Sequence, residues 1–258
     1  MPHLLEMRAI HKSFGAVRAV HNVDLYLDRG EILGLVGDNA AGKSTLMKIL
    51  TAFHQADRGK IFLNGEEVHI RTPAEARRLG IDMIYQDFSL APNLKIYENI
   101  FLGRELTRKI LGIPFLSRKQ MIEKSRQAIG VTHIAFDSVT RLVTDLSGGQ
   151  RQAVAIARAM AFDAKIIIMD EPTASLSVKT IPPLLELMLS LKSEGKSMIF
   201  ITHRIQDIFA TCDRIMVLRR GECVGVAKKE DTTIDEITSL IAGTKERFTN
   251  GDRAALTI

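Results

Sequence analysis

The stretch GDNAAGKST, from Gly37 to Thr45, has the residue types and spacing of a phosphate-binding loop. It matches the pattern G-x-x-x-x-G-K-S between the apolar run Ile32 to Val36 and the helical pattern TLMKIL. This setting disfavours the alternative of a glycine turn that only ends a strand. Backbone N–H groups and the helix N-terminus would hold phosphate oxygens, while Lys43 adds charge and Ser44 offers a ligand to Mg²⁺. The residues expected to bind the nucleoside triphosphate are Gly37, Asp38, Asn39, Ala40, Ala41, Gly42, Lys43, Ser44 and Thr45.

The segment KIIIMDEPTASLS, from Lys165 to Ser177, supplies two carboxylates that could complete such a site. Its apolar strand would end at Asp170, with Glu171 next to it. Adjacent carboxylates at a strand end are often only solvated, but delivery by a buried strand beside a phosphate loop favours catalysis. We expect Asp170 to hold Mg²⁺ and Glu171 to be the general base that polarises the attacking water, because phosphoryl transfer needs mainly positioning and charge compensation.

A second pair of glycines stands at the start of a predicted helix, in TDLSGGQRQAVAIARAM. Ser147 and Gln150 have the spacing of a capping box. A capping box does not explain Gly148 and Gly149, since each loses up to ~1 kcal/mol of helix propensity relative to alanine. Glycines would let a phosphate approach the helix N-terminus closely. If a helical subdomain carries this loop away from the first one, a second chain is the simplest source of that phosphate.

The composition is that of a globular protein, with 258 residues, of which 46% are hydrophobic and 25% charged. The formal net charge of +5 is scattered in pairs such as Arg77-Arg78, so nucleic-acid binding is not expected. Cys212 and Cys223 belong to no ligand motif, and the N-terminus lacks the layout of a secretion signal. No apolar run approaches the ~18 residues that span a bilayer. We therefore expect a cytoplasmic protein, for which any membrane role would have to come through a partner.

The pattern of apolar residues predicts an α/β fold with a mainly parallel sheet. The short apolar runs EILGLVG, KIIIMD and KSMIFITH are typical of central strands covered by helices on both faces. Alternating segments between Leu4 and Glu31, and a hairpin turn at Asn64-Gly65, predict antiparallel strands near the start. The strand signal fades between Asp87 and Leu146, where Ser117 to Gly130 has the pattern of an amphipathic helix. We therefore expect a helical insertion there.

These patterns predict three parts of the chain. We expect a nucleoside-triphosphate-binding core with its antiparallel subdomain over residues 1–87 and 151–241, a helical subdomain that carries the second glycine pair over residues 88–150, and a peripheral C-terminal tail over residues 242–258.

The motifs GDNAAGKST, LSGGQRQ, IIIMDEPT and ITHR, in this order and spacing, resemble those of the nucleotide-binding subunit of ATP-binding cassette (ABC) transporters. The similarity covers nearly the whole chain. In that family two cassettes pair head to tail, and the LSGGQ of one closes over ATP held by the other. The resemblance implies an ATPase with a P-loop NTPase (RecA-like) core, and it explains the second glycine pair as a half-site that only a dimer completes.

The resemblance also assigns roles to four residues outside the glycine loops. Phe14 matches the aromatic residue that stacks on adenine, and Val20 would line the same pocket. Gln86 matches the glutamine that meets Mg²⁺ and the attacking water, and His203 matches the histidine that contacts the γ-phosphate. From the residues alone, a core phenylalanine, a solvated loop glutamine and a structural histidine remain alternatives.

Two positions depart from the family pattern. Ala40 stands where such loops commonly have glycine, which restricts the local backbone to conformations that a Cβ allows. Ser177 stands where the family usually has an aspartate that helps communication across the dimer. The departures put the coupling between the two sites in more doubt than ATP binding.

The stretches Glu75 to Ile81, Tyr97 to Glu105 and ITHRIQDIF look like those of cassettes from bacterial importers of ribose, xylose, galactose or fructose. Most such proteins fuse two cassettes, whereas this chain has one and resembles the single-cassette variant of fructose importers. The resemblance implies a homodimer on the inner face of the cell membrane, bound to a sugar permease and served indirectly by a periplasmic sugar-binding protein.

The main alternative is a soluble cassette ATPase that acts on nucleic acid or ribosomes. It would normally have a fused second cassette, a long coiled coil or a basic arm. A simple kinase built on the phosphate loop is a third reading, and it leaves Ser147 to Gln150 unexplained.

Overall fold

A six-stranded sheet in the order β12-β11-β3-β10-β9-β6 forms the centre of the computed structural model, which describes residues 2–85, 89–110, 112–132, 134–174, 178–246 and 248. Strands β11, β3, β10, β9 and β6 pair in parallel, and β12 is antiparallel to β11. The three apolar runs predicted as central parallel strands are β3, β9 and β10, so this prediction is confirmed. The strands of this sheet are β3 (Ile32–Val36), β6 (Ile81–Ile84), β9 (Ile166–Asp170), β10 (Ser197–Ile201), β11 (Arg214–Arg219) and β12 (Glu222–Lys228).

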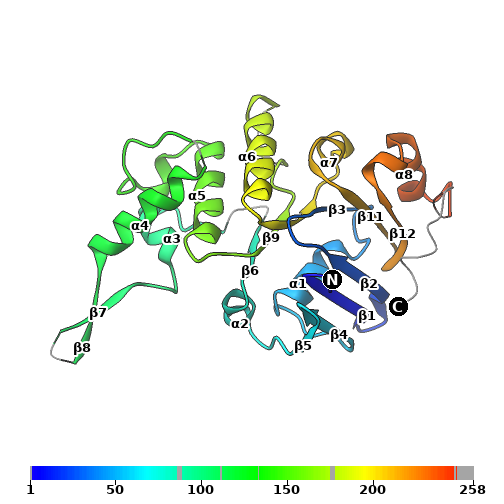
Figure 1. Ribbon diagram of the computed structural model, residues 1–258, viewed down its shortest axis with the longest axis horizontal. Helices are drawn as coiled ribbons and strands as arrows, with labels where there is room; N and C mark the ends of the chain where they lie inside the picture. The colour runs from blue at the N-terminus through cyan, green and yellow to red at the C-terminus, as the bar shows by residue number, and fades with distance from the viewer. Residues whose placement is uncertain are drawn as a thin grey trace.

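Alternate side chains of this sheet enter two separate hydrophobic cores, because successive residues of a strand point to opposite faces. Leu33 and Leu35 of β3 pack into the core that contains helix α1 (Lys43–Leu50) and the N-terminal strands. Ile32 and Val36 pack into the other core, with four helices. Figure 1 shows α6, α7 and α8 on one side of the sheet, with α1, β1 and β2 on the other. These four helices are α5 (Gly148–Met160), α6 (Ile181–Ser193), α7 (Ile205–Thr211) and α8 (Ile234–Ala242).

An antiparallel sheet in the order β2-β1-β4-β5 confirms the antiparallel start that we predicted. Asn64 and Gly65 connect β4 to β5 with φ angles of 55° and 84°, the left-handed conformation that a tight hairpin turn requires. The strands of this sheet are β1 (Leu5–Phe14), β2 (Val17–Leu27), β4 (Arg58–Leu63) and β5 (Glu66–Val68).

A third core lies in the helical part of the chain, where α3 (Ile96–Phe101), α4 (Arg118–Gly130) and α5 bury side chains against one another. The helix predicted over Ser117 to Gly130 is α4. The expected boundary at residue 150 lies inside α5, which packs Val154 into the third core and Ile156 into the second. The remaining helical elements are α2 (Pro73–Arg78), η1 (Val143–Asp145), η2 (Val178–Thr180) and η3 (Lys229–Asp231).

The helical part also contains a hairpin that we did not expect from the sequence. Strands β7 (Thr107–Ile110) and β8 (Ile113–Leu116) pair only with each other. The helical insertion that we expected here did not include these strands, because TRKI and IPFL show neither a clear alternation nor a long apolar run. Their turn uses Gly112 in the left-handed region, at a φ of 82°.

The described part of the chain contains no helix that is both long enough and apolar enough to cross a membrane. In the expected C-terminal tail, Phe248 packs against the second core beside Gly225 of β12. A Cβ at Gly225 would stand 2.4 Å from a ring carbon of Phe248, so the glycine makes this contact possible.

A buried ion pair ties the two sheets together. Arg214 of β11 donates through Nε to Oε1 of Glu31 at 2.7 Å and through Nη2 to Oε2 at 3.1 Å. Its Nη2 also donates to the carbonyl of Tyr26 on β2 at 2.7 Å, and its guanidinium lies 3.8 Å from the centre of the Tyr26 ring. Both charged side chains are almost fully buried, with 11% and 9% exposed. Loss of either partner would leave an unpaired charge inside the protein.

We expect the substitution Glu31→Ala to lower the free energy of unfolding by about 3 kcal/mol, because the Arg214 guanidinium would remain buried without its carboxylate. Denaturant titration measures this change. Glu230→Ala is the control, since Glu230 and Lys228 are 3.9 Å apart and both exposed, and we expect it to cost less than about 0.5 kcal/mol. Equal effects of the two substitutions would contradict a structural role for the buried pair.

Candidate phosphate-binding site

The predicted phosphate loop, Asp170, Glu171 and His203 meet at one edge of the central sheet. Parallel strands end at the same edge, and Ile201 of β10 lies opposite both Leu35 of β3 and Asp170 of β9. The loop after β3, the carboxylates at the end of β9 and His203 after β10 therefore come together. This edge is where open α/β sheets usually bind their ligands.

The loop from Gly37 to Gly42 follows a path that side chains would block at two places. A Cβ at Gly37 would stand 2.1 Å from the carbonyl oxygen of Leu218, and one at Gly42 would stand 2.5 Å from the carbonyl oxygen of Ala19. Both glycines also have positive φ angles, of 150° and 102°. The backbone of β2 and β11 thus presses directly on the loop, and only glycine fits at these two positions.

Ala40 has a φ of 65°, in the left-handed region that glycine adopts without strain. The departure from the usual glycine therefore has a structural consequence, since a left-handed residue with a Cβ costs roughly 1–2 kcal/mol. The rest of the loop holds Ala40 in this conformation.

Lys43 is buried within the loop that it follows. Its Nζ donates to the carbonyls of Gly37 at 2.6 Å and Asp38 at 2.8 Å. Burial lowers the pKa of Lys43, and the nearby carboxylates of Glu171 and Asp170 act in the opposite direction. The ammonium group therefore lies between the loop carbonyls and two carboxylates. There it would place a positive charge beside a bound phosphate.

Asp170 and Ser44 form the pair expected to hold Mg²⁺. Burial raises the pKa of Asp170, the hydrogen bond from the Ser44 hydroxyl lowers it, and the neighbouring Glu171 raises it further. Among the described residues, no group of three or more His, Cys, Asp and Glu side chains could form a metal cage. A hydroxyl and one carboxylate in contact fit Mg²⁺, which keeps several waters and takes phosphate oxygens as further ligands.

Glu171 and His203 face each other across the ends of β9 and β10. Oε1 of Glu171 lies 3.2 Å from Nδ1 of His203. Glu171 has a φ of 51°, and its backbone N–H donates to the carbonyl of Ile201 at 2.9 Å. A glutamate held in a left-handed conformation is strained, and such strain clusters at functional sites. Its carboxylate is thereby directed toward the histidine at the sheet edge.

Phe14 is 45% exposed at the end of β1, so it is not a core residue. Its ring meets the ring of His54 edge-on, with 5.1 Å between centroids, and the Lys12 ammonium lies 5.5 Å from its centre. Val20, by contrast, is 2% exposed and packs in the first core. Gln86 and Ser177 lie outside the described residues.

The second glycine pair forms the predicted capping box at the start of α5. Oγ of Ser147 accepts from the N–H of Gln150 at 3.3 Å, and Oε1 of Gln150 accepts from the N–H of Ser147 at 3.2 Å. A Cβ at Gly149 would meet only Cγ2 of Thr180, at an ordinary contact distance of 3.7 Å. The packing among the described residues therefore gives no reason for glycine at position 149.

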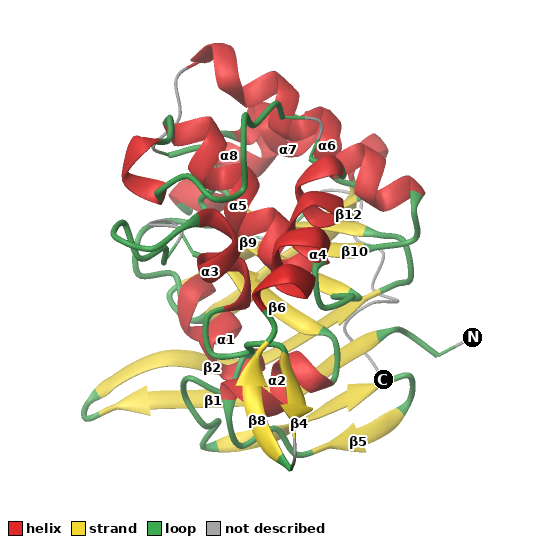
Figure 2. Ribbon diagram, turned by 90° about the vertical axis from the view of Figure 1, so that its left-hand side faces the viewer, coloured by secondary structure: helices red, strands yellow, loops and turns green. Residues whose placement is uncertain are grey.

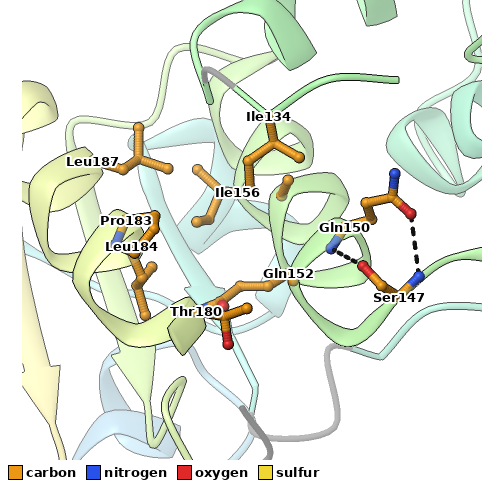
Figure 3. A pocket seen from close by; sticks show the side chains of 11 residues that line it. Ile134, Ser147, Gln150, Gln152, Ile156, Thr180, Pro183, Leu184 and Leu187 are labelled. Atoms are coloured by element: carbon orange, nitrogen blue, oxygen red, sulfur yellow. Dashed lines mark hydrogen bonds between the residues drawn. The ribbon is translucent and has the colours of Figure 1, made fainter. Parts of the chain in front are cut away.

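This first turn borders a cavity of about 230 Å³ between α5 and α6. Figure 3 shows the Ser147–Gln150 hydrogen bonds on one side of it and the side chains of Ile156, Leu184 and Leu187 on the other. Helix α1 and helix α5 pack on opposite faces of the central sheet. The two glycine stretches thus begin helices on opposite faces of the sheet.

The turn between β11 and β12 supports the phosphate loop, which we did not foresee from the sequence. The N–H of Gly221 donates to the carbonyl of Ala41 at 3.1 Å, and the carbonyl of Gly221 accepts from His21 at 2.7 Å. A Cβ at Gly221 would stand 3.0 Å from the carbonyl oxygen of Ala19. The dipeptide Arg220-Gly221 signals a turn, but only the fold places that turn against the loop.

We expect Gly221→Ala to weaken the binding of a fluorescent ATP analogue about tenfold, or ~1.4 kcal/mol, because the new methyl group would meet the carbonyl oxygens of Ala19 and Arg18 and displace the turn that bonds to Ala41. Gly195→Ala is the matched control. Gly195 has a φ of 85°, close to the 83° of Gly221, but nothing lies within 4 Å of its added Cβ. Both variants should lose stability to left-handed strain, and only the first should lose affinity. Equal affinities in the two variants would exclude the supporting role.

The sequence is similar throughout to known ATP-binding proteins. The family profile described as ABC transporter matches residues 20–174. The xylose/arabinose import ATP-binding protein XylG of Sulfolobus acidocaldarius is 48% identical over 241 residues, which are 93% of this chain and 94% of that protein. The ribose import ATP-binding protein RbsA of Caldanaerobacter subterraneus is 42% identical over 250 residues, 96% of this chain and 50% of its own length. The chain thus spans about half the length of this ribose relative.

The fold of this chain is also similar to that of solved ATP-binding cassettes. A nucleotide-free ATP-binding cassette from an ABC transporter superimposes with a TM-score of 0.79 at 24% identity, over 93% of this chain and 96% of that one. A dimeric bacterial ABC transporter cassette has a TM-score of 0.74 at 25% identity, over 87% of this chain and 98% of its own.

Proposed function

The chain belongs to the ABC transporter family, whose ATP-binding subunits are ATPases, and we propose that it energises the import of a monosaccharide. The observation that carries this proposal is the meeting of Lys43, the Ser44–Asp170 pair and the Glu171–His203 pair at one sheet edge. The relatives named for import of xylose/arabinose and of ribose support a monosaccharide as the cargo.

In the proposed reaction, the N–H groups of the loop from Gly37 to Thr45 bind the ATP phosphates, and Lys43 adds its charge to them. Ser44 and Asp170 hold Mg²⁺, which supplies positive charge to the phosphate oxygens when bound. The carboxylate of Glu171 accepts a proton from the attacking water as general base. His203, already within 3.2 Å of Glu171, donates a hydrogen bond to the γ-phosphate.

The base of the nucleotide would stack on the exposed ring of Phe14, which has no core contacts to lose. Its neighbours Lys12 and His54 fix the position of the ring. In the family Gln86 completes the site, and we keep this as a proposal for a residue outside the described part of the chain.

We expect Lys43→Ala to lower ATP hydrolysis at least about 100-fold, because it removes the only ammonium group bonded to the loop carbonyls of Gly37 and Asp38 in the described structure. A phosphate-release assay measures the rate. Lys48→Ala, one turn later on α1, is the control and should hydrolyse ATP at a near-normal rate. Near-normal hydrolysis by Lys43→Ala would reject the assignment of the loop.

The second half of each site would come from another copy of the chain, packed head to tail. Gly149 has space for a Cβ within its own chain, so its lack of a side chain suits an approaching group from outside. The N-terminus of α5 offers N–H groups and a positive dipole end to a phosphate. The similarity to a dimeric cassette supports this arrangement.

The substitution Gly149→Ala distinguishes a structural role of this glycine within its own chain from a role in binding a phosphate of the partner. Because alanine favours a helix and fits at this position, we expect the free energy of unfolding to rise by up to about 1 kcal/mol. We also expect ATP hydrolysis to fall at least about tenfold, since the methyl group would stand between the partner's phosphate and the helix N-terminus. Denaturant titration and a phosphate-release assay measure the two effects.

The control for this prediction is Gly130→Ala at the end of α4, where nothing lies within 4 Å of the added Cβ. It should leave hydrolysis unchanged. In a Glu171→Gln background, which slows hydrolysis, sedimentation should show a dimer with Mg-ATP and a monomer with Mg-ADP, and Gly149→Ala should abolish the dimer. A Gly149→Ala protein that dimerises and hydrolyses normally would exclude the shared site.

A permease would dock at the cavity between α2 and α3, on the cytoplasmic side of the cell membrane. This cavity of about 330 Å³ is lined from two of the stretches that resemble monosaccharide importers, through Ala76 and Arg77 of the first and Leu102 and Arg104 of the second. Exposed Phe53 adds an apolar side chain to its rim. A periplasmic sugar-binding protein would deliver the cargo to that permease.

A further inference from the structure

The β7–β8 hairpin projects from the helical part of the molecule, and no element of the described chain covers it. Figure 1 shows it extending beyond α3 and α4, and Figure 2 shows β8 at the near surface of the molecule. The two strands pair only with each other, and every described side chain from 107 to 109 and from 112 to 116 is exposed. Because an isolated two-stranded hairpin is at best marginally stable in water, a surface that binds it would stabilise it.

The hairpin exposes an unusual amount of apolar surface for its size. Ile113, Phe115 and Leu116 are 59%, 47% and 46% exposed. Single exposed apolar side chains are common, but three within four residues form a patch. In a strand Ile113 and Phe115 point to one face and Leu116 to the other. Both faces of the hairpin therefore expose apolar side chains. A strand that docks on a protein through one face would need apolar side chains on that face alone.

The charge of this segment is entirely positive. From Thr107 to Lys119 the sequence contains four basic residues and no acidic ones. In the register of the hairpin, Arg108 lies opposite Phe115 and Lys109 lies opposite Pro114, so each face has one basic residue beside apolar ones. Within the described part of the chain, no ion pair of 4.0 Å or less neutralises Arg108 or Lys109. Basic residues beside exposed aromatic and aliphatic ones are complementary to an anionic lipid surface.

The position of the hairpin agrees with such a contact. It follows directly on Leu102 and Arg104, which line the cavity proposed for the permease. The N–H of Ser117 donates to the carbonyl of Leu106 at 2.7 Å and closes the base of the hairpin at that place. Figure 1 shows the hairpin on the same side of the molecule as α2, away from α6, α7 and α8. If a permease docks there, this side faces the membrane.

We propose that the β7–β8 hairpin binds the surface of an anionic bilayer, with Ile113, Phe115 and Leu116 among the headgroups and Arg108 and Lys109 on the lipid phosphates. This inference rests on the proposed function, because the docked permease sets which side of the chain faces the membrane. The hairpin would be a second membrane contact, independent of the permease.

Co-sedimentation of the purified chain with vesicles tests the proposal. We expect binding to vesicles of phosphatidylglycerol and phosphatidylcholine, and much weaker binding to phosphatidylcholine alone. The double variant Ile113→Ser/Phe115→Ser should lower the partition coefficient about tenfold. Arg108→Gln/Lys109→Gln should remove the preference for the anionic vesicles.

The matched control is Leu189→Ser/Ile234→Ser, which removes two apolar side chains of similar exposure, 42% and 40%, from α6 and α8. It should bind vesicles like the unchanged chain. Absence of vesicle binding, or equal loss in control and hairpin variants, would overturn the proposal. Binding only to vesicles that contain the permease would also overturn it and identify a protein partner for the hairpin.

The rate of ATP hydrolysis without vesicles keeps this test separate from the proposed function. The hairpin residues lie outside the phosphate site, so both hairpin variants should hydrolyse ATP like the unchanged chain. A chain that binds vesicles through the hairpin but does not hydrolyse ATP would reject the proposed function and leave the lipid contact standing. The reverse result would reject the lipid contact alone.

Discussion

The backbone of β2 and β11 presses so closely on the phosphate loop that no side chain fits at Gly37 or Gly42. This steric constraint makes the loop one unit with the sheet rather than a free surface turn. The loop can then present its N–H groups to an anion without reorganising, which is the basis of electrostatic preorganisation. The N–H of Gly221 adds a hydrogen bond to the outer side of the same loop. The geometry of the site thus depends on backbone atoms from two strands and from the turn between β11 and β12.

Two residues of this site have strained backbone conformations. Ala40 and Glu171 both have left-handed φ angles, of 65° and 51°, although each carries a Cβ. The surrounding hydrogen bonds hold them there, since such conformations persist only where neighbouring structure determines them. At Glu171 the strain directs a carboxylate toward His203. These strained conformations lower the stability of the fold, and they position groups that would act on ATP.

The helical part of the chain stands in a different relation to the site. Its hydrophobic core includes side chains of α5. The capping box supplies hydrogen bonds to the backbone N–H groups of Ser147 and Gln150 at the start of α5. Nothing in the described packing requires glycine at position 149. The start of α5 is thus complete as a helix end, but its glycine at position 149 has no packing reason among the described residues. This supports the proposal that the start of α5 binds a phosphate held by a second copy of the chain.

The sequence by itself determined the ABC transporter family, the ATPase activity and the α/β fold, and these predictions are confirmed by the family match and by the solved cassettes. It could do so because the motifs are local. A glycine pattern, a capping box at Ser147 and Gln150, and the turn at Asn64-Gly65 each depend on neighbouring residues alone. The β7–β8 hairpin was missed because four-residue strands without alternation have no local signal.

Only the tertiary structure decided which distant residues meet. The contact of Glu171 with His203 and the support of the phosphate loop by Gly221 join segments that are far apart in the chain. The exposure of Phe14 and the burial of Val20 are also set by the packing around each side chain. Their geometry follows from the strand order, which places β3 between β11 and β10. Strand order is set by the packing of whole cores on both faces of the sheet, and no short stretch of sequence contains that information.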